Sequence, residues 1–131
     1  IGIEFDPQSI RGLLIDLENK IIGEKNYTLP EGTKGKQIIE LLKNIIHQLI
    51  TNNSLHSTPL LGIGIADPGL VDQERGISLF CSQIADWRDV PLRQILEKEF
   101  QLPISIEGNT NCKLLAESLF GAGRDFQNQI Y

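Results

Sequence analysis

The 131-residue chain is poor in the residues that build metal centres and disulfide frameworks. Its two cysteines, Cys81 and Cys112, lie far apart and outside any C-x-x-C spacing, so neither a metal site nor a redox pair is indicated. Free cysteine is among the most often buried residue types, and we expect two buried, reduced thiols. The two histidines, His47 and His56, have no further ligand at metal-binding spacing and are expected on the surface or on a helix face.

Basic charge and long apolar runs are scarce as well. Lys and Arg number 12 against 17 Asp and Glu, the net charge is −5, and both signs are interspersed along the chain. A DNA-binding surface needs a basic stripe that neutralises phosphates, so we expect no DNA contact from this chain itself. No apolar run approaches the length that crosses a bilayer, and Ile1 opens a strand-like segment without a basic leader. We therefore expect a cytoplasmic protein without membrane contact.

The rest of the composition is that of an ordinary globular protein, with 40% apolar and 22% charged residues. The length fits one domain with a sizeable core. Repeats, low-complexity tracts and linkers are absent from the sequence, so residues 1–131 are expected to form a single domain.

The hydrophobic pattern predicts an α/β protein with a mixed sheet. Three short segments rich in Ile and Leu, separated by turn residues, predict an antiparallel meander. Residues 36–52 carry apolar side chains at helical spacing, and strands and helices then alternate. The predicted strands are 1–5, 10–17, 21–29, 60–66, 77–80, 103–107 and the start of one at 129–131, and the further helices are 91–100 and 110–120.

Four stretches resemble, in order and with near-family spacing, motifs of the ROK family (repressors, open reading frames, kinases). The family patterns are G-I-D-I-G-G-T-K-x-x-G, G-I-G-I-x-x-P-G-x-V-D, P-N-L-x-x-W-x-D-V-P-L and L-A-E-x-x-F-G-A-G. Here they read IGIEFDPQSIRG, GIGIADPGLVD, CSQIADWRDVPL and LAESLFGAG, at residues 1–12, 62–72, 81–92 and 115–123. Each is weak alone, but four collinear matches identify the chain as a member of the family. The resemblance implies the ribonuclease-H-like lobe of the actin/hexokinase-type ATPase fold.

A fifth stretch resembles the family corner E-N-D-A-N-A-A-A-L-A-E, whose Asp removes the proton from the attacking sugar hydroxyl in family kinases. Glu107 and Asn111 match that corner, Gly108 replaces its first Asn, and Asn109 stands at the catalytic Asp position. An amide has no useful basicity near neutral pH. The comparison therefore implies no catalytic residue, although Asn109 is also placed to cap the helix that follows.

The family's glycine-rich phosphate loop is replaced here by Asp6-Pro7-Gln8-Ser9. Proline removes an N–H donor, and Asp6 places a negative charge where nucleotide phosphates would lie. We expect an ordinary hairpin turn and no nucleotide cofactor. Glu4, at the position of a family Asp near the nucleotide metal, is expected to be a strand-end carboxylate, so no metal site is predicted.

The sugar cleft of the family suggests four candidate ligand-binding positions. Gln83 stands where the family has the Asn of P-N-L, Gly108 and Asn109 occupy the corner, and Gly69 offers backbone. The alternative is that these are only cap and turn residues. Trp87 matches the family Trp and is expected to be a packing anchor rather than a platform for sugar.

Within the family, a chain that has lost both the base and the phosphate loop resembles members of the repressor branch, which includes xylose repressors. The resemblance implies the amino-terminal, sugar-sensing lobe of a homodimeric transcriptional regulator. Its DNA-binding domain would precede residue 1, and its second lobe would follow residue 131. Two alternatives stay open: a divergent sugar kinase, and a scaffold that binds no ligand.

Overall fold

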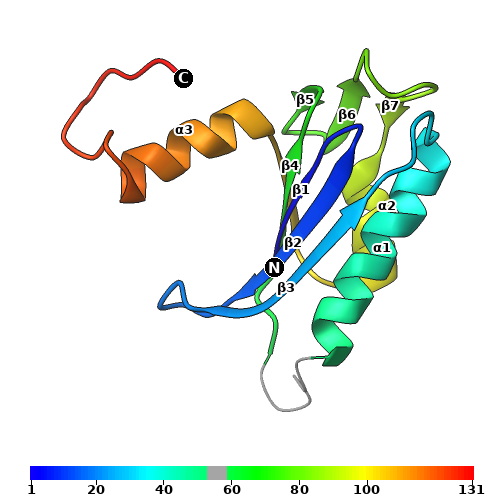
Figure 1. The fold of residues 1–131 in the computed structure, drawn as a ribbon, viewed down its shortest axis with the longest axis horizontal. Coiled ribbons are helices and arrows are strands. Elements are labelled where there is room, and N and C mark those ends of the chain that lie inside the picture. The colour runs from blue at the N-terminus through cyan, green and yellow to red at the C-terminus, as the bar shows by residue number, and fades with distance from the viewer. Residues whose placement is uncertain (53–58) are drawn as a thin grey trace.

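The structure, a computed structural model, describes residues 1–52 and 59–131, and His56 falls outside these ranges. A central sheet of five strands has the order β3-β2-β1-β4-β8 (Figure 1). The first three strands form the predicted antiparallel meander, and β4 and β8 run parallel to β1. Their bounds are β1 Gly2–Phe5, β2 Ser9–Ile15, β3 Ile21–Thr28, β4 Ile63–Asp67 and β8 Ile104–Gly108.

Two helices lie on one side of the central sheet and a third extends from the other side (Figure 1). Helix α1 packs on β2 and β3, and α2 packs on β8, whereas the main neighbours of α3 in the sheet are β4 and β8. The helices confirm the predicted pattern at α1 Gly35–Asn52, α2 Leu92–Phe100 and α3 Asn109–Phe120. The chain therefore has the predicted α/β fold class with a mixed sheet.

The core lies between the central sheet and α1. The apolar stripe of α1, including Ile38, Leu42 and Ile46, is fully buried against the meander. Gly12 permits this approach, because a Cβ at this position would come within 2.8–2.9 Å of side-chain carbons of Ile3, Ile45 and Leu49. Burial of this stripe accounts for the position of α1.

Trp87 is the packing anchor that the sequence predicts. It is 1% exposed, and its ring centroid lies 5.3 Å from that of Phe5. Its indole N–H donates to the Ser78 hydroxyl oxygen at 2.6 Å, so the polar end of the buried ring has a partner.

A small antiparallel sheet, β5-β6-β7, adds two strands that the pattern did not predict. Only β6 had been expected, because three-residue strands are too short to show an alternating pattern. Arg93 of α2 braces the turn between β5 and β6, donating to the carbonyl oxygens of Gln73 at 2.6 Å and Glu74 at 3.0 Å. The bounds are β5 Leu70–Asp72, β6 Ile77–Phe80 and β7 Arg88–Val90.

The ends of some predicted elements differ in the structure. The predicted strand at 129–131 is wrong, since these residues have no regular structure. The predicted side-chain cap from Asn109 is also wrong: the N-cap is Gly108, and Asn109 is the first residue of α3. Helices α1 and α3 end at Asn52 and Phe120, as predicted, and Gly121 is the C-cap of α3.

Candidate functional site

A hollow of about 250 Å³ opens at the carboxyl ends of the parallel strands β4 and β8. The chain leaves β4 through the Pro68–Gly69 turn and leaves β8 directly into α3, so the two exits diverge and leave space between them. Gly69, Gly108 and Asn109 all line it, together with Gln73, Glu107 and the rest of the first turn of α3.

Gln83 is not brought to this hollow. It is exposed in the turn between β6 and β7 and is absent from the lining. Three of the four candidate ligand positions therefore come together, although Gly69 is far from Gly108 and Asn109 in the sequence, and the fourth does not.

The backbone N–H of Gly69 is not free to bind a ligand in the hollow. Its N–H donates to the Asp67 carboxylate at 2.7 Å, so this donor is already used within the protein. A Cβ here would collide with the Phe80 carbonyl oxygen, which explains why glycine is needed. The contribution of Gly69 is a close approach of the turn to β6.

Gly108 leaves open space in the hollow. It has an ordinary extended backbone, and a Cβ built on it meets nothing within 4 Å. The position therefore needs neither glycine's flexibility nor its small size. A Cβ atom at this position would displace no neighbour.

Asn109 keeps its amide available at the edge of the hollow. It is half-buried, and the only side-chain hydrogen bond that it makes within the described residues is a long one of 3.4 Å, which its Oδ1 accepts from the Thr110 hydroxyl. No side chain caps the helix, so the N–H groups of the first turn of α3 also lack side-chain acceptors. Both the amide and these N–H groups can bond a polar ligand.

Glu107 is the residue whose role the sequence did not reveal, although it matches the family motif. Its Oε1 accepts the Gly108 N–H at 2.6 Å and the Asn111 amide at 3.0 Å, and its Oε2 accepts the Gln73 amide. This carboxylate is therefore occupied by three donors and ties the β5–β6 turn to α3.

The turn at residues 6–9 is the predicted hairpin turn. The Asp6 carboxylate accepts the backbone N–H groups of Gln8 and Ser9, both at 2.7 Å, and the Ser9 hydroxyl at 3.1 Å. Two donors that a phosphate would need are bonded to an internal anion. The hydrogen-bond donors of the turn are therefore paired within the turn itself.

Glu4 is a strand-end carboxylate, as predicted, and it forms an ion pair with Lys113 of α3 at 3.0 Å. This hydrogen bond and the charge of Glu4 raise the pKa of the Lys113 ammonium. The described residues contain no group of three or more His, Cys, Asp and Glu side chains placed to hold a metal ion.

Asp67 is a buried carboxylate beneath the Gly69 turn. Its side chain is fully buried, and its Oδ2 has no hydrogen-bond partner among the described residues. Burial raises the pKa of Asp67, and the Ser78 hydroxyl and the Gly69 N–H partly offset this rise. It faces the core with Ile63 and Ile65 rather than lining the hollow.

Both thiols are free, and only Cys81 is buried, whereas Cys112 is half-buried near the hollow. Burial, followed by the charges of Glu107 and Glu4, raises the pKa of the Cys112 thiol. The expectation of two buried thiols therefore holds for Cys81 and only in part for Cys112. His47 lies on the surface of α1, as predicted, at 2.9 Å from Glu99.

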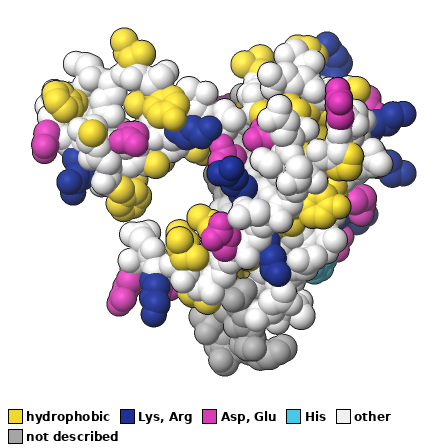
Figure 2. All heavy atoms as spheres, in the orientation of Figure 1, with side chains coloured by type: hydrophobic (Ala, Val, Ile, Leu, Met, Phe, Trp, Pro, Cys, Tyr) yellow, Lys and Arg dark blue, Asp and Glu magenta, His cyan; other side chains and the backbone are white. Residues whose placement is uncertain are grey.

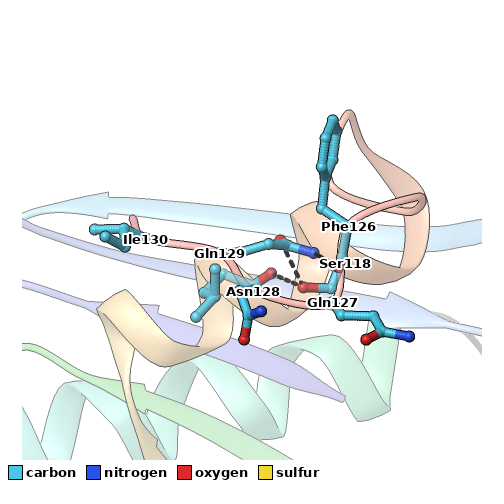
Figure 3. A pocket seen from close by; sticks show the side chains of 7 residues that line it. Ser118, Phe126, Gln127, Asn128, Gln129 and Ile130 are labelled. Carbon is cyan, nitrogen blue, oxygen red and sulfur yellow. Dashed lines mark hydrogen bonds between the residues drawn. The ribbon is translucent and has the colours of Figure 1, made fainter.

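A larger hollow, of about 540 Å³, lies between α3 and the carboxyl-terminal segment (Figure 3). Ser118 and Gln129 approach each other there with side-chain oxygens 2.9 Å apart, and the Gln129 amide also donates to backbone carbonyls of its own segment. None of the predicted site residues lines this hollow. None of the helices in residues 1–52 and 59–131 has both the length and the apolar character of a transmembrane segment.

Comparison with known proteins places the chain in a family. The model that defines the ROK family matches residues 1–131. The chain belongs to the ROK family. It is 35% identical to the xylose repressor of Bacillus spizizenii, over all of this chain and 33% of that protein. It is also 30% identical to the glucokinase of Thermotoga maritima, over 95% of this chain and 38% of that one.

Solved ROK structures share the fold. A ROK family transcriptional regulator, a homologue of the E. coli MLC protein, superposes with a TM-score of 0.84 at 22% identity, covering 96% of this chain and 31% of that one. A Streptomyces griseus ROK glucokinase, solved with glucose and AMPPNP, gives 0.77 at 25% identity, covering 93% and 36%. These neighbours show the actin-like ATPase fold.

The ROK chain described here spans about a third of the length of the curated repressors that it matches. Its relatives carry the names of both repressors and glucokinases. Family membership therefore supports a regulator without excluding a kinase, and the residues of the hollow must decide between them.

Proposed function

We propose that this chain is the effector-binding lobe of a ROK transcriptional regulator, which binds a carbohydrate and does not phosphorylate it. The observation that carries the proposal is the chemistry of the hollow between the Gly69 turn and α3. Its side chains offer the Asn109 amide, and its one carboxylate, Glu107, is held by three donors. Hydroxyl groups can bond to amides, but no free base is present to take their proton.

The hairpin at residues 6–9 supports the same reading independently. A nucleotide needs free backbone N–H groups around its phosphates, and here the Asp6 carboxylate uses those of Gln8 and Ser9. Phosphate oxygens would also be repelled by Asp6. The lobe thus lacks both the acceptor for a sugar proton and the cradle for the phosphate donor.

In the complete regulator, a cytoplasmic homodimer, a separate amino-terminal domain binds the operator, and a second lobe closes over the sugar. Sugar binding favours one arrangement of the lobes and changes operator affinity through the contacts that differ between states. DNA contact through a separate domain agrees with the net charge of −5 on this chain.

The kinase alternative is favoured by the glucokinases among the relatives. Full-length protein titrated with D-xylose and D-glucose in a calorimeter, and assayed with ATP and magnesium for ADP, separates the two. We expect heat of binding from one of the sugars and no sugar-dependent ADP. ADP release that depends on sugar and is lost on mutation of the hollow would overturn the proposal.

The scaffold alternative predicts neither signal. A ligand that binds only the folded state raises its thermal stability by mass action. A melting temperature that stays constant across a panel of pentoses and hexoses would therefore favour a lobe that only holds the dimer together.

A further inference from the structure

Helix α3 is attached to the sheet in a different way from α1. None of its 12 residues is buried: Leu114 is half-buried, and Leu115, Leu119 and Phe120 are more than half exposed. Apolar packing therefore does little to fix its direction within the described residues. The hollow is nevertheless lined by its first turn, residues 109–111, so the direction of α3 determines where Asn109 lies.

Two acids stand in one row across the sheet beneath this helix. Glu4 of β1 is in register with Ala66 of β4, and Ala66 is in register with Glu107 of β8. Neighbours in register on parallel strands point to the same face. Ile3 and Phe5 are buried toward the α1 side, so the Glu4 carboxylate points to the α3 side.

Helix α3 bridges these two acids. Asn111 donates to Glu107 at 3.0 Å, and Lys113 pairs with Glu4 at 3.0 Å. Cys112 lies between them in the sequence, and burial, followed by the charges of Glu107 and Glu4, raises the pKa of its thiol. The helix is thus held at two points on two different strands, which together fix its direction.

Lys113 is coupled to Asn109 through the helix. Positions 109 and 113 are four residues apart and therefore lie on one face of α3. Neither Lys113 nor Glu4 lines the hollow. A change in their pairing can reach a bound ligand only by moving the helix.

We propose that the Glu4–Lys113 ion pair positions Asn109 for the carbohydrate, as a latch that holds α3 across the sheet. This inference rests on the proposed function for its ligand, although the latch itself does not. Lys113 and Glu4 are positioning residues, since they act on the ligand through α3. Their side chains are 45% and 35% exposed, so the pair is partly screened by solvent. An exposed pair has a modest effect, here about two- to fivefold in sugar affinity.

The test uses the full-length protein with Lys113→Gln, Glu4→Gln, Lys113→Arg and the exchange Glu4→Lys/Lys113→Glu. Lys98→Gln, an exposed lysine in the last turn of α2, is the matched control. Calorimetry with D-xylose and D-glucose measures affinity at low salt and at 1 M NaCl. Hydrogen–deuterium exchange of residues 109–120 measures the attachment of α3 without any ligand.

We expect both Gln variants to bind the sugar about two- to fivefold more weakly and to exchange the α3 amides faster by a similar factor. Lys113→Arg and the charge exchange restore both values, and the control leaves them unchanged. High salt weakens binding by the wild type but not by the Gln variants, because only the wild type has an ion pair to screen. A purely structural defect would not show this salt dependence or this rescue.

The two proposals fail separately. If neither sugar binds the wild type, the proposed function loses its support, and amide exchange alone decides the latch. If sugar binds but Lys113→Gln leaves both affinity and α3 exchange unchanged, the latch is overturned while the proposed function stands.

Discussion

The two sides of the central sheet are built on different principles. On one side, α1 buries six residues, and Trp87 and Phe5 extend the same apolar layer. On the other side, α3 buries none of its residues. Its polar links to the sheet are the Lys113–Glu4 ion pair and the hydrogen bond from the Asn111 side-chain amide to Glu107. Figure 2 shows hydrophobic side chains exposed on the part of the molecule that α3 and the segment after it form.

Because of this difference, the two sides should contribute unequally to the stability of the fold. Each large apolar side chain that is fully buried adds about 1.5–3 kcal/mol to the free energy of unfolding. An exposed ion pair adds less than about 1 kcal/mol. The α1 side therefore fixes the fold, and the α3 side can be shifted at low cost. The hollow lies on the α3 side, which agrees with the effector-binding role proposed above.

Truncating one leucine on each side of the sheet should give very different losses of stability. Leu42→Ala, on α1, removes a side chain that is fully buried and should lower the free energy of unfolding by about 3 kcal/mol. Leu119→Ala, on α3, removes one that is 55% exposed and should cost less than about 0.5 kcal/mol. Urea denaturation of the 131-residue chain measures both, and equal losses would refute the asymmetry.

Arg93 tests whether the small sheet belongs to the rigid side. Arg93→Met removes charged hydrogen bonds to the carbonyl oxygens of Gln73, Glu74 and Ile104, and should cost about 2 kcal/mol. Arg75→Met, in the same turn, removes only an exposed pair with Asp72 and should change little. Thermal denaturation compares the two, and a neutral Arg93→Met would place this hairpin among the mobile elements.

Asp67 predicts a pH dependence on the rigid side. Burial raises its pKa above the ordinary value of 3.8, so the folded state keeps the proton to higher pH than the unfolded state does. Its contribution to stability therefore falls as pH rises from about 4 through the raised pKa. Asp67→Asn should remove this fall and stabilise the fold at pH 7 by about 1 kcal/mol.

The exposed Asp89→Asn serves as the control for this measurement. Urea denaturation at several pH values between 3 and 8 gives the curves for both variants. A wild-type curve that rises through this window in step with Asp67→Asn would contradict the assignment.

A substitution at Gly108 should have a smaller effect and tests the N-terminus of α3. The position has room for a side chain and is the N-cap of the helix, where Asn is preferred. Gly108→Asn should stabilise α3 by a few tenths of a kcal/mol and slow its amide exchange, since Gly is only slightly inferior at this position. Faster exchange would show that the added side chain does not reach the helix N–H groups.

The regular elements with strong periodicity were predictable. Helix α1 follows from its apolar stripe, and the meander from three apolar runs separated by turn residues. The short strands β5 and β7 were not, because three residues carry no pattern and are held by neighbours distant in the sequence. The missing strand at 129–131 and the cap moved to Gly108 show that local propensity alone does not determine element ends.

The site was predictable as chemistry and only in part as geometry. The family motifs suggested four ligand positions. The fold brings Gly69, Gly108 and Asn109 to one hollow and leaves Gln83 outside it. The three donors on Glu107 come from residues that only the folded chain brings around it. A sequence shows which groups are present, and the fold decides which of them are already bonded.

The central claim is that an amide at position 109 binds sugar and cannot take its proton. The direct test titrates full-length wild type and Asn109→Ala with D-xylose and D-glucose while ADP is followed in the presence of ATP. We predict sugar binding by the wild type without ADP release, and binding weakened about tenfold in Asn109→Ala. Sugar-dependent ADP release by the wild type that Asn109→Ala abolishes would contradict the account.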